Sequence, residues 1–192
     1  MNTSTPLQRS RQEWERESVN MFQVQARYRE IVQECGFRLP NRYDEFADQA
    51  RRIRKAMQLN PEPLVPCNND LLAANIIDDG QRLWLIDYEY SGNNEASFEL
   101  GNIWSESTLA EDLLTTLVAQ YWNGISDAKL ARARLWALMS KYGWTLWAAI
   151  QSEVSPIDFD YWSWGMEKYE RAIEEFSDPR IEQWMEQLAL KE

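Results

Sequence analysis

The most restrictive feature of this 192-residue sequence is that helical spacing of apolar residues fills most of it, while strand signals occur at one place. After about residue 95 every segment has the periodicity of a helix, and Gly124, Pro156 and Pro179 separate the segments. The predicted helices are 95–106, 109–123, 127–151, 158–176 and 179–190. We therefore expect a mainly α domain with one small β element.

Two further helices are predicted near the beginning of the chain. Residues 11–35 show helical periodicity, and Gly36 is placed to end that helix. Residues 43–58 form a charged helix whose apolar stripe consists of Tyr43, Phe46, Ala47, Ala50, Ile53 and Met57. Prolines at 61, 63 and 66 then force extended backbone. We expect one compact lobe, with a helical segment over 1–60 followed by a catalytic and helical segment over 61–192.

The strand signals consist of two short apolar runs, 75–78 and 82–87, separated by Asp79-Gly80. Asp-Gly between two such runs is typical of a β-hairpin turn. The sequence therefore predicts one small hairpin within the helical body.

Charge and composition exclude several classes of protein. The net charge of −11 disfavours binding to nucleic acid or to anionic membranes, because both carry the same sign. The same charge suits a cationic substrate. No apolar run is long enough for a membrane span, and two cysteines, Cys35 and Cys67, do not form a disulfide framework. We expect a cytoplasmic protein with reduced thiols.

The chain contains no histidine, so imidazole cannot serve as a metal ligand or a general base. A candidate set of oxygen ligands surrounds the predicted hairpin: Asp70, Asn75 five residues later, and Asp87 at the end of the second strand. Phosphoryl transfer uses one carboxylate to accept the hydroxyl proton, and an amide oxygen with a second carboxylate to hold Mg²⁺. The alternative, left open by the spacing, is a loop in which these side chains only cap turns.

These residues also resemble a known family. The run Asn68-Asn69-Asp70-Leu-Leu-Ala-Ala-Asn75, together with Leu-Ile-Asp87-Tyr-Glu-Tyr and Phe98-Glu-Leu-Gly-Asn102, is similar to the choline/ethanolamine kinases. The resemblance covers roughly residues 20–178. It implies the carboxyl-terminal lobe of a protein-kinase-like α+β fold, Asp70 as catalytic base, Asn75 and Asp87 as Mg²⁺ ligands, and ATP as co-substrate.

The helical half extends the resemblance to the family's ammonium pocket. Trp144 and Trp147 stand at i and i+3 on one helix face, and aromatic faces bind quaternary ammonium groups. The resemblance adds Tyr90, Glu106 and Trp164 as further walls. The alternative is an aromatic stripe that packs in the core.

Two departures from the family pattern are visible. The family has a histidine where this chain has Asn68, and we expect Asn68 to replace some of its hydrogen bonds but not its ring packing, which impairs the loop geometry. No glycine-rich phosphate loop occurs, and Lys55 is the single lysine before Asp70. We therefore expect the family's amino-terminal ATP-binding lobe to be absent, so that this truncated chain binds ATP weakly. The sequence leaves open whether the chain turns over or is inactive alone.

Three functions follow as alternatives. The first is transfer of the ATP γ-phosphate to the hydroxyl of a small amino alcohol, choline or ethanolamine. The second is a non-catalytic module that binds choline or another quaternary ammonium. The third is an oligomeric scaffold, because a face left uncovered favours a homo-oligomer or a partner that supplies the absent lobe.

Overall fold

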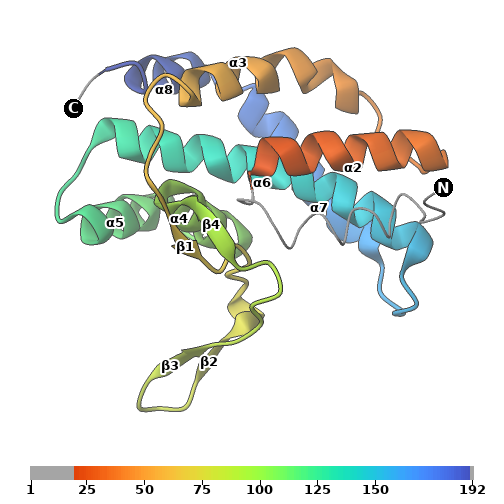
Figure 1. The fold of residues 1–192 in the computed structure, drawn as a ribbon, viewed down its shortest axis with the longest axis horizontal. Helices are drawn as coiled ribbons and strands as arrows, with labels where there is room; N and C mark the ends of the chain where they lie inside the picture. The colour runs from red at the N-terminus through yellow and green to blue at the C-terminus, as the bar shows by residue number, and fades with distance from the viewer. Residues whose placement is uncertain (1–19, 191–192) are drawn as a thin grey trace, which may run out of the picture. The chain divides into compact units, whose positions relative to one another are not determined.

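The computed structural model describes residues 20–190 (Figure 1). Tertiary contacts divide these residues into two compact units. The first unit contains residues 20–50 and 138–178, and the second contains 51–137 and 179–190. Helices α3 (Ala47–Met57) and α6 (Asp127–Val154) contribute residues to both.

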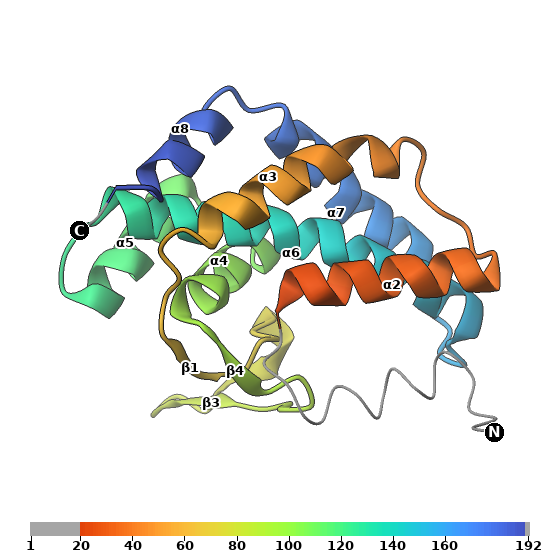
Figure 2. The ribbon, with the colours of Figure 1, turned by 45° about the horizontal axis from the view of Figure 1, so that its top comes forward.

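The first unit is helical. It contains α2 (Met21–Cys35), a 3₁₀ turn (Tyr43–Phe46), the beginning of α3, the second half of α6, and α7 (Tyr161–Phe176). Figure 2 shows α2 and α7 alongside this half of α6. Glycines permit the close approach: a Cβ on Gly143 would lie 2.4 Å from Met21 Sδ on α2, and one on Gly165 would lie 2.5 Å from Ala148 Cβ.

Two buried tyrosines link the two chain segments, 20–50 and 138–178, that form this unit. The rings of Tyr43 and Tyr142 stack with centroids 4.1 Å apart, and each hydroxyl donates to the other residue's carbonyl oxygen, at 2.7 and 2.8 Å. Burial raises the pKa of both hydroxyls, so both stay neutral donors. These contacts join the 3₁₀ turn to the middle of α6.

The second unit combines helices with two small antiparallel sheets. Its strands are β1 (Leu64–Cys67), β2 (Ile76–Asp78), β3 (Leu83–Leu85) and β4 (Gly92–Glu95), with a 3₁₀ turn (Ala73–Asn75) before β2. Strand β1 pairs with β4, with Leu64 opposite Glu95, and β2 pairs with β3, with Ile76 opposite Leu85. Its helices are α4 (Ala96–Glu106), α5 (Glu111–Trp122), the first half of α6, and α8 (Ile181–Gln187).

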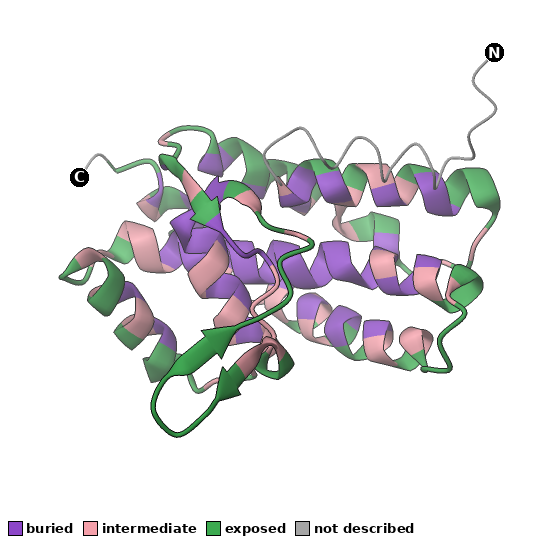
Figure 3. Ribbon diagram, turned by 60° about the horizontal axis from the view of Figure 1, so that its bottom comes forward, coloured by how far each residue is buried: buried purple, intermediate pink, exposed green. Residues whose placement is uncertain are grey.

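The β2–β3 hairpin projects from the rest of this unit and is exposed from Ile77 onward, as Figure 3 shows in green. Asp79 fixes its turn: Oδ1 accepts hydrogen bonds from the backbone N–H groups of Gln81 and Arg82, and Oδ2 accepts one from Trp84 Nε1 at 2.6 Å. Gly80 adopts φ 82°, the left-handed conformation that glycine tolerates best. The hairpin can therefore keep its shape without core burial.

The expected fold class is confirmed: the chain is mainly helical with small antiparallel sheets. Gly36 ends α2 with φ 66°, as predicted. Residues 11–19 of the predicted 11–35 helix lie outside the described residues, while the 43–58 helix begins as a 3₁₀ turn and α6 extends to Val154. Strands β1 and β4 were not predicted. The division at residue 60 stays a prediction.

Within residues 20–190, none of the helices has the length and apolar composition needed to cross a bilayer.

Candidate active site

Asp70 and Asn75, two of the three predicted phosphotransfer residues, are in direct contact. Asp70 lies in the loop after β1, and the 3₁₀ turn Ala73–Asn75 folds the chain back toward it. Asn75 Nδ2 donates to the Asp70 carbonyl oxygen at 3.0 Å and to Asp70 Oδ2 at 3.2 Å. The turn therefore converts a spacing of five residues into a side-chain contact.

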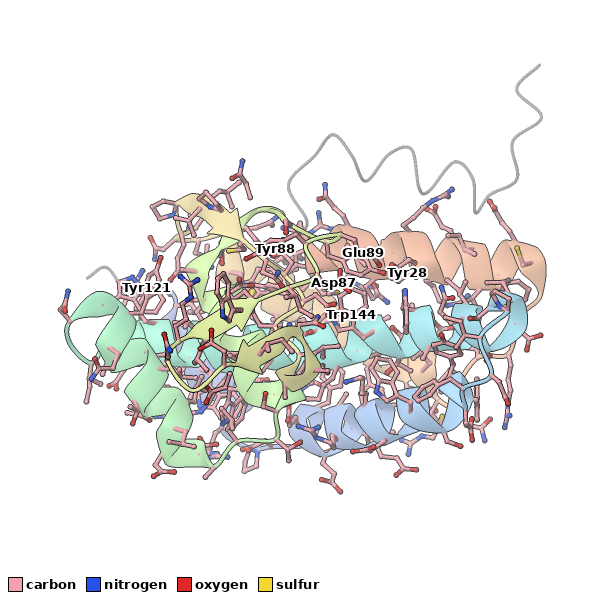
Figure 4. All side chains as sticks on the ribbon, turned by 90° about the horizontal axis from the view of Figure 1, so that it is seen from below. Tyr28, Asp87, Tyr88, Glu89, Tyr121 and Trp144 are labelled. Atoms are coloured by element: carbon pink, nitrogen blue, oxygen red, sulfur yellow. The ribbon has the colours of Figure 1, made fainter. Side chains whose placement is uncertain are left out.

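Asp87 reaches the same region through the register of the hairpin. Ile86 N–H donates to the Asn75 carbonyl oxygen at 3.0 Å, which extends the β2–β3 ladder by one pair and leaves Asp87 directly beyond it. Asp87 is exposed and adopts φ 58°. Figure 4 shows Asp87, Tyr88 and Glu89 along the segment that follows β3.

Asn68 connects the two loops. Its Nδ2 donates to the Asp87 carbonyl oxygen at 2.9 Å, and its Oδ1 accepts from the Asp70 backbone N–H at 3.0 Å. One buried amide side chain therefore bridges the backbones of both predicted functional carboxylates.

Electrostatics also connects these residues. The pKa of Asp70 is raised to about 6, first by burial and then by the negative charges of Asp87, Glu106 and Glu89, while the hydrogen bond from Asn75 opposes the shift. At neutral pH the Asp70 carboxylate is mostly ionised and has a higher proton affinity than an exposed aspartate. Such a carboxylate can accept a proton from an alcohol that loses it during attack.

The donor chemistry at this place fits a magnesium ion. Among residues 20–190, no three His, Cys, Asp or Glu side chains are arranged as a metal site, so the ion would depend on the amide of Asn75 as well as on Asp87. Carboxylate and amide oxygens suit Mg²⁺, which also takes ligands from phosphate and water. Its positive charge would offset the repulsion among the carboxylates that raises the pKa of Asp70.

The predicted ammonium-pocket tryptophans form one cluster in the first unit. The Trp147 ring makes edge-to-face contacts with Trp144 and Trp164, at centroid distances of 6.2 and 5.6 Å, and with Tyr161 at 5.6 Å. Trp144 is buried, and the other two tryptophans are half-buried. Lys168 Nζ lies 4.1 Å from the Trp164 ring centroid. The cluster therefore already binds one ammonium group of the chain itself.

The remaining predicted wall residues lie in the second unit. Tyr90 stands in the segment between β3 and β4, where its carbonyl oxygen accepts a hydrogen bond from Asn69 Nδ2 at 2.9 Å. Glu106 ends α4, and its negative charge acts on Asp70. Both are therefore connected to the Asp70 loop, Tyr90 through Asn69 and Glu106 through its charge.

Two residues of this site were not predicted. Glu89 contributes to the charge around Asp70, and its place two residues after Asp87 in Ile-Asp-Tyr-Glu was the available signal. Glu99 on α4 binds the backbone of the Asp70 loop. Its place in the run Phe98-Glu-Leu-Gly-Asn102 was the available signal, but the contact itself joins peptide groups about thirty residues earlier and comes from the tertiary structure.

Comparison with known proteins identifies similar kinases over much of the chain. The family model described as choline/ethanolamine kinase matches residues 3–127. The chain is 36% identical to ethanolamine kinase 2 from Mus musculus over 120 residues, which is 52% of this chain and 31% of that protein. It is 34% identical to thiamine kinase from Shigella boydii serotype 4 over 102 residues, covering 49% of this chain and 35% of that protein. The aligned part spans about a third of either relative.

A solved structure shares the fold. The crystal structure of a choline/ethanolamine kinase family protein from Mesorhizobium loti superimposes with a TM-score of 0.83 at 24% identity, covering 92% of this chain and 60% of that one. The helices and small sheets of this chain therefore form a fold already seen in a larger protein.

Proposed function

The chain belongs to the choline/ethanolamine kinase family, and we propose that it carries the catalytic loop and metal-binding strand of an ATP-dependent kinase for a small amino alcohol. The observation that supports this most is the contact of Asp70 with Asn75, with Asp87 at the end of the hairpin that Asn75 begins.

Asp70 is proposed as the general base. Its carboxylate accepts the proton of the substrate hydroxyl, the oxygen forms a bond to the γ-phosphorus, and the bond from that phosphorus to the bridging oxygen breaks to release ADP. The place of Asp70 in the loop after β1, in contact with the proposed metal ligand Asn75, supports this role.

Asn75 and Asp87 are proposed to hold Mg²⁺, which when bound supplies positive charge to the phosphate oxygens. The contribution of the chain is to hold these oxygens in place. Asn68 supports that role structurally, since it bonds to the backbone of both Asp70 and Asp87. The impaired geometry expected from asparagine at this position stays a prediction.

The substrate class is proposed from the aromatic cluster and from the family. Trp144, Trp147 and Trp164 are proposed as walls for a cationic head group, and the Lys168 ammonium over Trp164 is an example of such a contact within the chain. Tyr90 and Glu106 are proposed as additional substrate contacts. The named relatives make ethanolamine, choline and thiamine the substrates to compare.

The test is phosphate transfer from ATP to each of these three alcohols with Mg²⁺, followed by ³¹P NMR of the product. Asp70→Asn should lower the rate about 10²–10⁴-fold, because a general base contributes that much. Asp112→Asn, an exposed aspartate on α5, is the matched control and should keep the native rate. Equal rates in the Asp70→Asn and native chains would remove Asp70 from the mechanism.

Metal binding is measured separately with Mn²⁺ as a paramagnetic substitute. Asp87→Asn should weaken Mn²⁺ binding at least tenfold, since it removes a charged oxygen ligand, whereas Asp112→Asn should not. Unchanged Mn²⁺ affinity in Asp87→Asn would contradict the proposed metal site.

The alternative of a non-catalytic ammonium-binding module predicts choline binding without turnover. Choline added to the native chain would then change the tryptophan fluorescence, and Trp144→Ala would reduce the response, while no phosphorylated product forms. Self-association, a partner that completes the enzyme, and a cytoplasmic location all stay predictions.

A further inference from the structure

Lys168 on α7 places an ammonium group against the tryptophan cluster of the first unit. Its Nζ lies 4.1 Å from the centroid of the Trp164 ring, and the residue is only 6% exposed. Trp164 and Lys168 stand at i and i+4 on α7, so the two side chains lie on the same face of the helix. The ammonium group therefore stands over the ring at a place that water barely reaches.

The ring under Lys168 belongs to the cluster that is proposed to bind the substrate head group. Trp164 contacts Trp147 edge to face at a centroid distance of 5.6 Å, and Trp147 contacts Trp144 in the same way at 6.2 Å. A cation is attracted to a ring face when it lies within about 6 Å of the ring centroid. Lys168 therefore already makes, on Trp164, the kind of contact that a cationic head group would need.

A second cation in this cluster would also meet the charge of Lys168. Two like charges repel each other, and the repulsion is stronger away from water, where the effective dielectric constant is lower. A neutral head group of the same shape gains the same apolar burial without that repulsion. Lys168 therefore reduces the advantage that aromatic rings normally give to a cation over its neutral counterpart.

Another cation–ring contact on α7 offers a comparison. Arg38 Cζ lies 3.8 Å from the centroid of the Trp162 ring, but Arg38 is exposed, so solvent and salt screen its charge. Trp162 is not one of the residues proposed to bind the head group. Arg38 is therefore a matched control for the removal of a cation from a tryptophan ring.

We propose that Lys168 is a specificity-determining residue, which lowers the affinity of the tryptophan cluster for cationic head groups by holding its own ammonium over the Trp164 ring. The proposal rests on the substrate pocket proposed above and narrows the class of alcohol that this pocket accepts. The native chain should distinguish choline little from 3,3-dimethylbutan-1-ol, the neutral alcohol in which a carbon atom replaces the ammonium nitrogen.

The test measures the binding of choline and of 3,3-dimethylbutan-1-ol to the full chain by ligand-observed NMR titration. Lys168→Met keeps an apolar side chain of similar length, and it should bind choline about tenfold more tightly than the native chain does, with little change for the neutral alcohol. Lys168→Gln, a second neutral variant, should show the same gain. Lys168→Arg keeps the charge and should keep the native choline affinity, as should Arg38→Met.

The neutral alcohol separates an effect of charge from an effect of shape. A larger or collapsed pocket would change the binding of both alcohols equally, whereas removal of a positive charge favours choline alone. An unchanged choline affinity in the neutral variants, or an equal gain for both alcohols, would overturn the proposal. Trp144→Ala added to Lys168→Met should abolish the gain, and a gain that persists would contradict binding in the cluster.

Phosphate transfer from ATP in the same samples distinguishes this inference from the proposed function. A gain in choline binding by Lys168→Met, without transfer in the native chain, would support the inference and reject the proposed kinase activity. Transfer to choline by the native chain, with unchanged choline affinity in Lys168→Met, would keep the activity and overturn the inference.

Discussion

At the scale of single residues, the environment gives side chains of the same type different proton affinities. Asp70 and Asp79 are both loop aspartates, yet burial and neighbouring carboxylates raise the pKa of Asp70 to about 6, while hydrogen bonds from Trp84 and the turn backbone lower the pKa of Asp79. Asp70 therefore binds a proton more readily than an exposed aspartate does, whereas Asp79 stays ionised as the acceptor of the turn's hydrogen bonds. The neighbours in sequence already predicted a turn at Asp79-Gly80 and a functional loop at Asp70, and the structure adds the physical cause of the difference.

The two cysteines differ in the same way, which leads to a prediction. Cys35 is exposed, whereas Cys67 is buried, and burial together with the charge of Glu99 raises the pKa of Cys67 to about 12. The thiol stays protonated up to that pH in the folded chain, so it is unreactive at pH 8. A thiol reagent such as Ellman's reagent should modify one cysteine in the native protein and two in denaturant.

The control is Cys35→Ser, which should leave no reactive thiol in the native protein; one rapid equivalent in that variant would contradict the burial of Cys67. The sign for stability follows from the same shift. Above about pH 9 the unfolded chain loses the Cys67 proton while the folded chain keeps it, so this group lowers stability as pH rises.

At the scale of helices and strands, the sheet that holds the Asp70 loop was the part that sequence patterns missed. Strand β4 reads Gly-Asn-Asn-Glu and β1 contains Pro66, neither of which is typical of a strand. Their pairing places Cys67 opposite Gly92, which brings the beginning of the Asp70 loop beside the segment that follows Asp87. Long-range pairing, and not local preference, forms this sheet.

The contact of α4 with α6 in the second unit depends on one glycine. A Cβ at Gly101 would lie 2.1 Å from the Ala133 carbonyl oxygen, a backbone atom that cannot move alone. Gly101→Ala should therefore destabilise the chain by about 2–3 kcal/mol, in the upper part of the range for overpacking. Urea unfolding followed by circular dichroism measures this.

Gly124→Ala is the matched control, because nothing lies within 4 Å of the position that its added methyl group would occupy, and its φ is not left-handed. It should change the free energy of unfolding by less than about 1 kcal/mol. Similar losses in the two variants would mean that α4 and α6 do not depend on the close approach at Gly101.

At the scale of the whole molecule, each unit has its own interior, and the second unit's interior is partly ionic. Arg132 donates to both oxygens of Glu95 at 3.1 and 2.8 Å and to the carbonyl oxygens of Met57 and Asn60, while Trp136 Nε1 donates to Glu95 at 2.7 Å. These contacts join the end of α3, the end of β4 and the first half of α6. A single buried network therefore ties distant parts of the chain together.

Replacement of Arg132 should show how much the stability of the fold depends on this network. Arg132→Met leaves Glu95 buried without its partner, and we expect a loss of about 3–5 kcal/mol in the free energy of unfolding. Arg52→Met, which removes an exposed pair with Glu182, should cost at most about 1 kcal/mol. A loss below about 1 kcal/mol for Arg132→Met, measured by urea unfolding, would show that the network is not needed for stability.

The sequence by itself determined the helices, the β2–β3 hairpin and the family, because these depend on spacing and on motifs read along the chain. Asp70, Asn75 and Asp87 were predicted from such a motif; the short turn brings Asn75 onto Asp70, and the hairpin places Asp87 one residue beyond the pairing of Ile86 with Asn75. The tertiary structure alone decided which groups surround them. Glu99 accepts hydrogen bonds from peptide groups about thirty residues earlier, the Lys168 ammonium lies over the Trp164 ring, and β1 pairs with β4. Such contacts depend on how distant segments meet in three dimensions, which local preferences do not specify.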